Sequence, residues 1–419
     1  MATGYLEILR ARHALRLLTG TLVGRLPNAT AAIALVLFVR AEGGTYSLAG
    51  ALAAVYGVAN AVGQPVLGRL VDLYGQPRVQ LPAAVLAAAS MTLFAFSGTD
   101  PLPQAYVAVA AAGLFAPPLE GGLRALWPSV LRREEQVHTA YAMDAVAQEI
   151  MFTVGPLLVT LCVSLWDQRA ALLVLNVLGV LGALSVVVSP PSRAWRSAPR
   201  EAHWLGALRS AGLLALLGAF LFVGVALGSI TVASVSYADA HGGDAVYGWM
   251  MAGLGLGALV GGTLYGAREW AGPPERRLRV LVALLAVCYL PLTLAPGAVA
   301  MVVLSVVSGV FLAPCIACAF IIVDRHAPSG TVTEAFSWLV TTFTVGASAG
   351  TGVTGPVVQA GGTVWGFAVP GAAGAVSLLV LLATGKVLAA PARGGVVASS
   401  SENDPNRAVE PRFSSGDRA

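Results

Sequence analysis

The sequence predicts an all-α membrane protein in which 12 transmembrane helices form two pseudo-symmetric six-helix bundles. Three observations carry this prediction. Hydrophobic residues make up 57% of the 419-residue chain and charged residues only 11%, whereas about 25% of the residues in a typical soluble domain are charged. Apolar segments of about 20 residues, the length that crosses a bilayer as a helix, recur along the chain. Small and aromatic residues of the first half also recur in the second half at a nearly constant spacing.

The apolar segments follow one another as in a polytopic membrane protein, with short polar or proline-bearing stretches between them. We expect the spans at residues 17–39, 48–70, 79–98, 104–124, 138–163, 169–189, 210–233, 246–267, 279–296, 298–322, 333–358 and 364–386. The resulting domains are an N-terminal bundle (1–188), a cytoplasmic linker (189–209), a C-terminal bundle (210–388) and a tail (389–419). The tail is rich in Ser, Gly, Pro and charge and has little to bury, so we expect it to be disordered.

Arginine and lysine indicate the orientation, because short cytoplasmic loops carry an excess of basic residues. Of the 25 basic residues, 22 lie in segments that are cytoplasmic when both termini are inside. Only Arg40 and Arg169 lie in the outer loops, and Arg25 lies within the first apolar segment. We therefore expect a multi-pass protein of the plasma (inner) membrane with both termini in the cytoplasm.

The two halves of the chain repeat each other at offsets of 198, 196 and 195 residues, in chain order. Three near-equal offsets are stronger evidence of duplication than any single match, because glycine is frequent in membrane helices. The matched pairs are Gly50, Gly57, Gly63 and Gly68 with Gly248, Gly255, Gly261 and Gly266; Gly113, Phe115 and Pro118 with Gly309, Phe311 and Pro314; and Ala140, Tyr141 and Gly155 with Ala335, Phe336 and Gly350.

Other classes of protein are disfavoured. The net charge is only +4, and no basic cluster is interleaved with aromatic residues, so no nucleic-acid partner is expected. Cys315 and Cys318 form a CxxC pair in an apolar segment, and a zinc site would need two further ligands nearby. The stretches 346–350 (GxSxG) and 253–258 (GxGxGA) lack the strand that a hydrolase elbow or dinucleotide site requires, and both are interpreted as helix packing. We expect no enzyme activity, no cofactor and no metal.

A short charged turn between the second and third spans carries Gly68, Asp72, Gly75 and Arg78. It resembles the signature loop of the major facilitator superfamily, although Leu73 stands where that family usually has a basic residue. Gly68 lets two helices approach closely, and Gly75 permits a tight reversal. We expect Asp72 to hold a cytoplasmic gate by accepting hydrogen bonds from arginines of the first half or from a helix N-terminus. An ordinary polar membrane turn is the alternative.

The span 138–163 contains Gly155-Pro156, which resembles part of a second signature of the same family, one associated with antiporters. The double glycine that usually follows is replaced by Leu157 and Leu158, which weakens the antiport inference. A proline kink is a sufficient structural explanation.

Ionisable residues in the middle of spans are the sharper functional signal, because each is costly in the bilayer. Arg25 and Glu149 lie near the middle of their spans, and we expect them to pair. Asp144 and Gln148 share a face of the same helix as Glu149, whereas Glu149 points elsewhere. Asn28, close to Arg25, completes the set expected to handle substrate or protons; a lock between two helices is the alternative.

Glu120 and Arg124 have i,i+4 spacing near the cytoplasmic end of the span 104–124, and we interpret them as a structural interfacial pair. In the second half, Asp239, Asp244, Asp324 and Glu334 lie at span ends or in loops. The interior there is lined by Ser, Thr, Tyr and apolar groups, which suits a mostly neutral substrate.

The resemblance to the major facilitator superfamily covers about residues 10 to 388 and implies alternating access driven by an ion gradient. Within it the chain looks most like bacterial drug and metabolite exporters, but the basic residue usual in the middle of their fourth helix is absent. We expect a monomeric secondary transporter for a small, mostly neutral organic molecule, with proton-coupled export. The alternatives are an importer of a small nutrient and a non-transporting membrane receptor.

Overall fold

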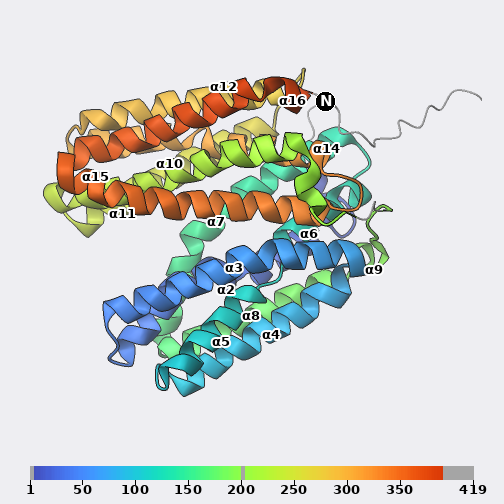
Figure 1. Ribbon diagram of the computed structural model, residues 1–419, viewed down its shortest axis with the longest axis horizontal. Helices are drawn as coiled ribbons and strands as arrows, with labels where there is room; N and C mark the ends of the chain where they lie inside the picture. The colour runs from blue at the N-terminus through green and yellow to red at the C-terminus, as the bar shows by residue number, and fades with distance from the viewer. Residues whose placement is uncertain (1–3, 200–202, 390–419) are drawn as a thin grey trace, which may run out of the picture.

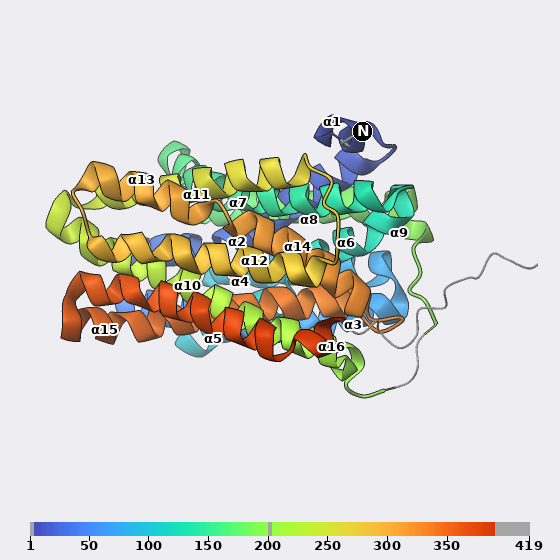
Figure 2. The same ribbon diagram turned by 90° about the horizontal axis from the view of Figure 1, so that it is seen from above.

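The computed structural model describes residues 4–199 and 203–389, apart from the side chains of 152, 153 and 244. The first half is helical in its apolar segments, apart from a break at residues 115–118. Its helices are α1 (Tyr5–Arg10), α2 (Ala14–Ala41), α3 (Tyr46–Tyr74), α4 (Gln76–Ser97), α5 (Leu102–Leu114), α6 (Leu119–Val130), α7 (Glu134–Leu165) and α8 (Gln168–Val187). All but α1 lie within one bundle, and α1 is a short helix beside α7 (Figure 2).

The second half follows a linker that carries two short helices, α9 (Pro190–Ala194) and η1 (Gly206–Arg209). Its helices are α10 (Ala211–His241), α11 (Asp244–Gly266), α12 (Pro274–Tyr289), η2 (Leu290–Leu294), α13 (Ala298–Gly309), α14 (Leu312–His326), α15 (Val332–Ala383) and α16 (Gly385–Ala389). Of the predicted tail (389–419), only residue 389 belongs to the described residues.

Twelve membrane crossings account for the described chain, as predicted. Eleven helical segments there are long and apolar enough to cross a membrane. One of them, α15, has 52 residues, which as a straight helix would be about 78 Å long, more than twice the bilayer core. Gly362, with φ 79° and ψ −177°, interrupts the helix and divides it into the two expected spans.

Two crossings are broken at corresponding positions. In the first half α5 ends at Leu114 and α6 begins at Leu119; in the second half α13 ends at Gly309 and α14 begins at Leu312. Prolines near each break remove backbone donors and disfavour a continuous helix. The helix α6 continues to Val130, beyond the expected end of the fourth span at residue 124.

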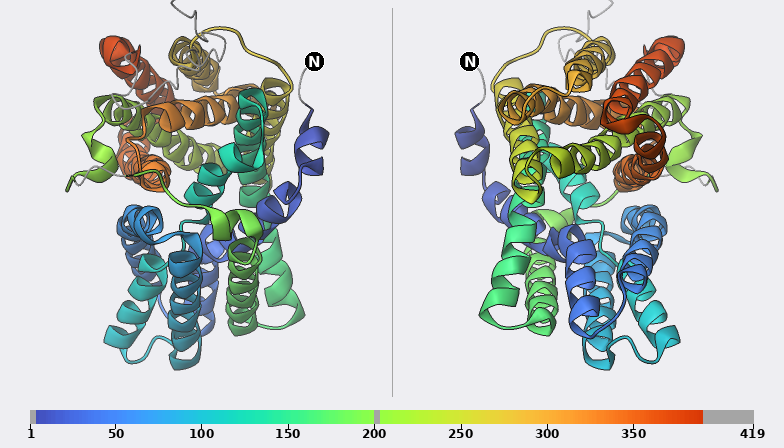
Figure 3. Two further views of the ribbon diagram at one scale, coloured as in Figure 1. Left: turned by 90° about the vertical axis from the view of Figure 1, so that its right-hand side faces the viewer. Right: turned by 90° about the vertical axis from the view of Figure 1, so that its left-hand side faces the viewer.

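The two bundles approach each other most closely at the end where α6, α9 and α14 lie, and they diverge toward the opposite end (Figure 1). The end-on views in Figure 3 show an upper and a lower group of helices, with α7 (teal to green) running between them. Small residues permit the close approach: a Cβ on Gly68 of α3 would lie 3.1 Å from the Glu334 Cα of α15. This end is the one predicted to be cytoplasmic.

Candidate functional site

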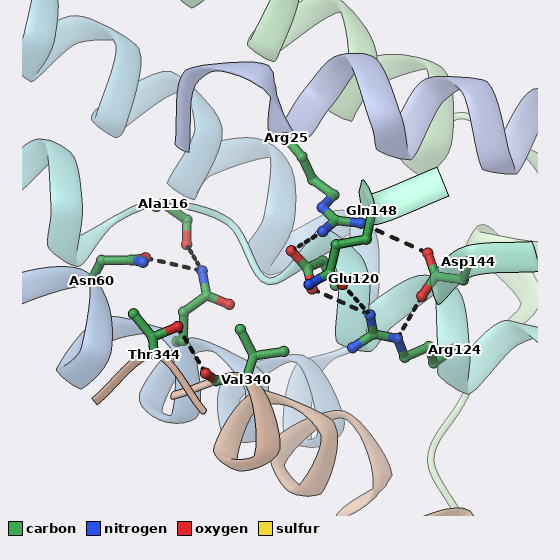
Figure 4. A network of polar contacts seen from close by, with 10 residues as sticks. Arg25, Asn60, Ala116, Glu120, Arg124, Asp144, Gln148, Val340 and Thr344 are labelled. Carbon is green, nitrogen blue, oxygen red and sulfur yellow. Dashed lines mark hydrogen bonds and ion pairs between the residues drawn. The ribbon is translucent and has the colours of Figure 1, made fainter. Parts of the chain in front are cut away.

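Four charged side chains meet inside the N-terminal bundle and form one network (Figure 4). Arg25 of α2 forms an ion pair with Glu120 of α6 and has its Nη1 3.7 Å from Oδ1 of Asp144 on α7. Arg124 of α6 has its Nε 2.6 Å from the other Asp144 oxygen and its Nη2 3.3 Å from Glu120. Its Nη2 also donates to Gln148 Oε1 at 3.5 Å. Each carboxylate therefore contacts both arginines.

The break between α5 and α6 positions half of this network. Glu120 lies in the first turn of α6, where the helix N-terminus favours a negative charge. Arg124 follows one turn later on the same face. A continuous helix would place these two side chains in a different rotation and depth, so the Pro-bearing break determines where the charges point.

The network is buried and electrically balanced. Arg124 and Asp144 are 0% exposed, Arg25 is 6% exposed and Glu120 is 15% exposed. A single charge at this depth costs about 2.5–3.5 kcal/mol on insertion scales. Two guanidinium groups and two carboxylates neutralise one another when all are ionised, so removing any one of them leaves an uncompensated charge.

One of two sequence expectations about these residues needs correction. Arg25 was expected to pair with Glu149, but its carboxylate partners are Glu120 and Asp144. Glu149 is five residues after Asp144, about 140° further round the helix, so α7 presents Asp144 and not Glu149 to Arg25. The i,i+4 pair of Glu120 and Arg124 is confirmed, and both side chains also belong to the buried network through Arg25 and Asp144.

A cavity of about 50 Å³ lies beside the network, inside the N-terminal bundle. This is room for a few water molecules or a small chemical group. Its polar lining comes from α2, α3, α6 and α8, and apolar residues of α2, α4, α5, α8 and the α5–α6 break form the rest. The polar lining residues are Arg25, Asn28, Thr30, Tyr56, Gln64, Glu120 and Asn176.

Hydrogen bonds order this cavity, but the side-chain amide of Asn176 donates none. The Tyr56 hydroxyl donates to Asn28 Oδ1 at 3.2 Å, and Gln64 Nε2 donates to the Ala116 carbonyl at 3.0 Å, in the helix break. Non-helical backbone at membrane depth is tolerated where it lines a cavity. Asn176 is 7% exposed, and its Nδ2 has no hydrogen-bond partner in the structure. Tyr56, Gln64 and Asn176 were not predicted from the sequence, since single neutral polar residues are common in membrane helices.

The loop motif contacts the other bundle as expected. Asp72 at the end of α3 accepts hydrogen bonds from the backbone nitrogens of Thr333 at 3.1 Å and Glu334 at 2.9 Å, at the N-terminus of α15. A carboxylate is stabilised there by the unsatisfied N–H groups and by the helix dipole. Gly75 ends α3 with φ 88°, and Arg78 is exposed. The contact is therefore confirmed, while its role as a gate stays a prediction.

The Gly155-Pro156 motif of α7 has a packing role. Gly155 of α7 faces α2, and a Cβ there would lie 2.9 Å from the Thr30 methyl group. Pro156 lies inside the same helix. Glycine at 155 thus allows α2 and α7 to approach closely, which helps to bring Arg25 and Asp144 together.

Comparison with known proteins gives one family. The family model described as Major Facilitator Superfamily matches residues 17–302. No curated protein matches the sequence.

Several solved transporters share the fold. A bacterial homologue of the iron transporter ferroportin, in an outward-facing state, is 14% identical with a TM-score of 0.70, covering 89% of this chain and 99% of its own. A variant of the E. coli fucose:proton symporter is 17% identical with a TM-score of 0.66, covering 88% and 97%. The human organic anion transporter MFSD10 is 18% identical with a TM-score of 0.64, covering 88% and 97%. At these identities the likeness establishes the fold.

Proposed function

This chain belongs to the major facilitator superfamily, and we propose that it is a secondary active transporter that moves a small, mostly neutral organic molecule by alternating access. The observation that carries the proposal is the buried, balanced network of Arg25, Glu120, Arg124 and Asp144 beside a cavity. Charges in a membrane interior are expensive and mark substrate or ion pathways. Here they lie beside a cavity lined by non-helical backbone, which is typical of transport sites built on discontinuous helices.

The chemistry of the cavity supports a neutral substrate group. The network carries no net charge when its four members are ionised, so it has no spare charge for an ionic ligand. The Asn176 amide offers an unpartnered donor, which suits a carbonyl, ether or hydroxyl oxygen. Alanine, methionine, leucine and valine side chains line the remainder and suit an apolar body.

Alternating access is supported by the contact between the bundles at one end. Asp72 holds the N-terminus of α15, and the bundles diverge toward the other end (Figure 1). With both termini in the cytoplasm, this state is closed inside and outward-facing. The opposite state requires the Asp72 contacts to break and the bundles to separate at this end.

Glu120 is the residue that we propose for proton coupling. It is the most exposed member of the network, it lines the cavity, and its two oxygens contact Arg25 and Arg124. A proton on Glu120 would leave two guanidinium groups against the single carboxylate of Asp144. That imbalance favours hydration of the arginines and therefore rearrangement of the bundles.

A toxicity and accumulation screen in a host without its own exporters tests the function. Cells that express the chain should tolerate and exclude at least one neutral, apolar compound, and cells that express Glu120→Gln at equal membrane abundance should not. A protonophore should abolish the difference. Import would appear as greater accumulation and sensitivity, and the absence of any gradient-dependent effect across a broad compound set would count against transport.

A further inference from the structure

Three aromatic rings meet where the two bundles touch. Tyr141 comes from α7, whereas Phe320 comes from α14 and Phe336 from α15. The ring centroids are 6.1 Å apart for Tyr141 and Phe320, 5.9 Å for Tyr141 and Phe336, and 6.1 Å for Phe320 and Phe336. All three side chains are at most 2% exposed. We call them the aromatic triad.

Arg124 lies against this triad from the N-terminal bundle. Its guanidinium carbon is 3.7 Å from the ring centroid of Phe320 and 5.8 Å from that of Phe336. The same guanidinium bonds Asp144, Glu120 and Gln148. One fully buried cation therefore contacts the charge network of its own bundle and two rings of the opposite bundle. The attraction of a cation to an aromatic face is strongest when the cation is desolvated, as it is here.

The contact between Arg124 and the aromatic triad lies close to the end where the two bundles meet. Asp72 binds the backbone of Glu334 at the N-terminus of α15, and Phe336 follows two residues later on that helix. The triad thus lies between the Asp72 contact and the charge network. Separation of the bundles at this end would remove Phe320 and Phe336 from Arg124.

We propose that Arg124 couples the charge network to closure of this end, by stacking on Phe320 and Phe336 of the C-terminal bundle. The inference rests on the proposed function, because it requires alternating access. While Asp144 and Glu120 are both ionised, they hold the guanidinium in the position that meets the rings. Neutralising either carboxylate, by a proton or a bound ligand, removes one ion pair of Arg124. The guanidinium is then free to move, and its contact with Phe320 and Phe336 weakens. Arg124 is a positioning residue in this scheme, not a substrate ligand.

Alkylation of a reporter thiol measures the closure directly, without knowledge of the substrate. Ser337→Cys is a suitable reporter, because Ser337 is 2% exposed and a Cβ on Gly68 would lie 2.6 Å from its hydroxyl. The background carries Cys288→Ser, which removes the one native cysteine that is not buried. Inverted membrane vesicles expose this end to a membrane-impermeant maleimide, and vesicles without the reporter give the baseline.

We expect Phe320→Leu to raise the alkylation rate on the order of tenfold, as loss of a desolvated cation–π contact implies. Fluorinated phenylalanines at 320, which keep the ring's shape but weaken its negative face, should raise the rate in step with the number of fluorines. Phe367→Leu is the matched control: Phe367 is equally buried but packs on Tyr237, away from the network. It should leave the rate unchanged.

Asp72→Asn serves as the reference for an opened end. If it accelerates alkylation and the fluorinated series does not, Phe320 acts only as apolar bulk, and the coupling role of Arg124 is wrong while alternating access stands. If neither Asp72→Asn nor any Phe320 variant accelerates alkylation, alternating access at this end is itself contradicted. An alkylation rate that rises with the number of fluorines, together with an unchanged rate in Phe367→Leu, supports the coupling.

Discussion

The two bundles share one plan but differ in their interiors. Both contain a broken crossing at corresponding positions, α5 to α6 and α13 to α14. At the offset of 196 residues, Ile316 corresponds to Glu120 and Phe320 to Arg124; at 195, Leu339 corresponds to Asp144. The C-terminal bundle thus has an apolar group at each position where these three network members stand in the N-terminal bundle. The C-terminal bundle packs without those charges, so its fold does not require them.

The comparison also explains the contact between the bundles. Phe320 and its counterpart Arg124 face each other across the pseudo-symmetric interface at 3.7 Å. One position, duplicated in the sequence, has become a ring on one side and a cation on the other. An asymmetric pair of this kind gives the two halves a specific mutual contact, which two apolar residues would not provide.

The largest effect should come from breaking the balance of the network at one residue. Asp144→Leu removes the carboxylate 2.6 Å from Arg124 and leaves that fully buried cation with less compensation. Losing one partner of a buried ion pair costs about 3–5 kcal/mol. We expect a much lower apparent unfolding temperature in detergent and little protein in the membrane. Stability equal to wild type would show that Arg124 is compensated by other groups.

Making the interior of the N-terminal bundle apolar, as the C-terminal one is, should restore stability without restoring function. The variant Arg25→Leu, Glu120→Ile, Arg124→Leu and Asp144→Leu removes all four charges together. Apolar replacement of a buried ion pair is often neutral or stabilising, so its unfolding temperature should approach that of wild type and exceed that of Asp144→Leu. Transport should be absent. Transport by this variant would reduce the network to a structural lock between helices.

Mutation of the Asp72 contact between the bundles should destabilise the protein less than mutation of the network. It should still impair the transport cycle. Asp72→Asn removes the charge from two hydrogen bonds to α15, and hydrogen bonds to charged groups contribute about 1.5–3 kcal/mol. The closed state should lose population by about tenfold or more, and transport should fall while membrane abundance stays largely intact. Arg78→Gln, at an exposed position of the same motif, is the matched control. Wild-type transport by Asp72→Asn would remove its role as a gate.

The smallest effect is expected from polar groups of the C-terminal bundle. Ser308 of α13 donates to the carbonyls of Cys288 and Leu304, at 3.0 and 2.8 Å. Ser308→Ala removes one neutral donor, and such hydrogen bonds average about 0.6 kcal/mol in membrane helices. Transport and unfolding temperature should both remain near wild type. A strong transport defect with normal stability would instead indicate that the C-terminal bundle also contacts the substrate.

Sequence alone determined the membrane class, the twelve crossings and the internal repeat, and it offered a helix N-terminus as one of two possible partners for Asp72. These follow from hydropathy, spacing and capping chemistry, which are properties of a segment and its close neighbours in the chain. Four of the charged or polar residues in and around the network are expected from the sequence to handle substrate or protons, namely Arg25, Asn28, Asp144 and Gln148.

Only the tertiary structure decided which of these side chains meet. Arg25 and Glu149 were matched by depth in the membrane, yet Arg25 contacts Asp144 and Glu120. Depth is readable from sequence at 1.5 Å per residue, but a helix turns by 100° per residue, so a partner also depends on the rotation of each helix. That rotation is set by close packing, such as Gly155 against Thr30, and by the break that begins α6 at Leu119. The contact of Arg124 with Phe320 depends further on how one bundle sits on the other, and no local pattern in either segment records it.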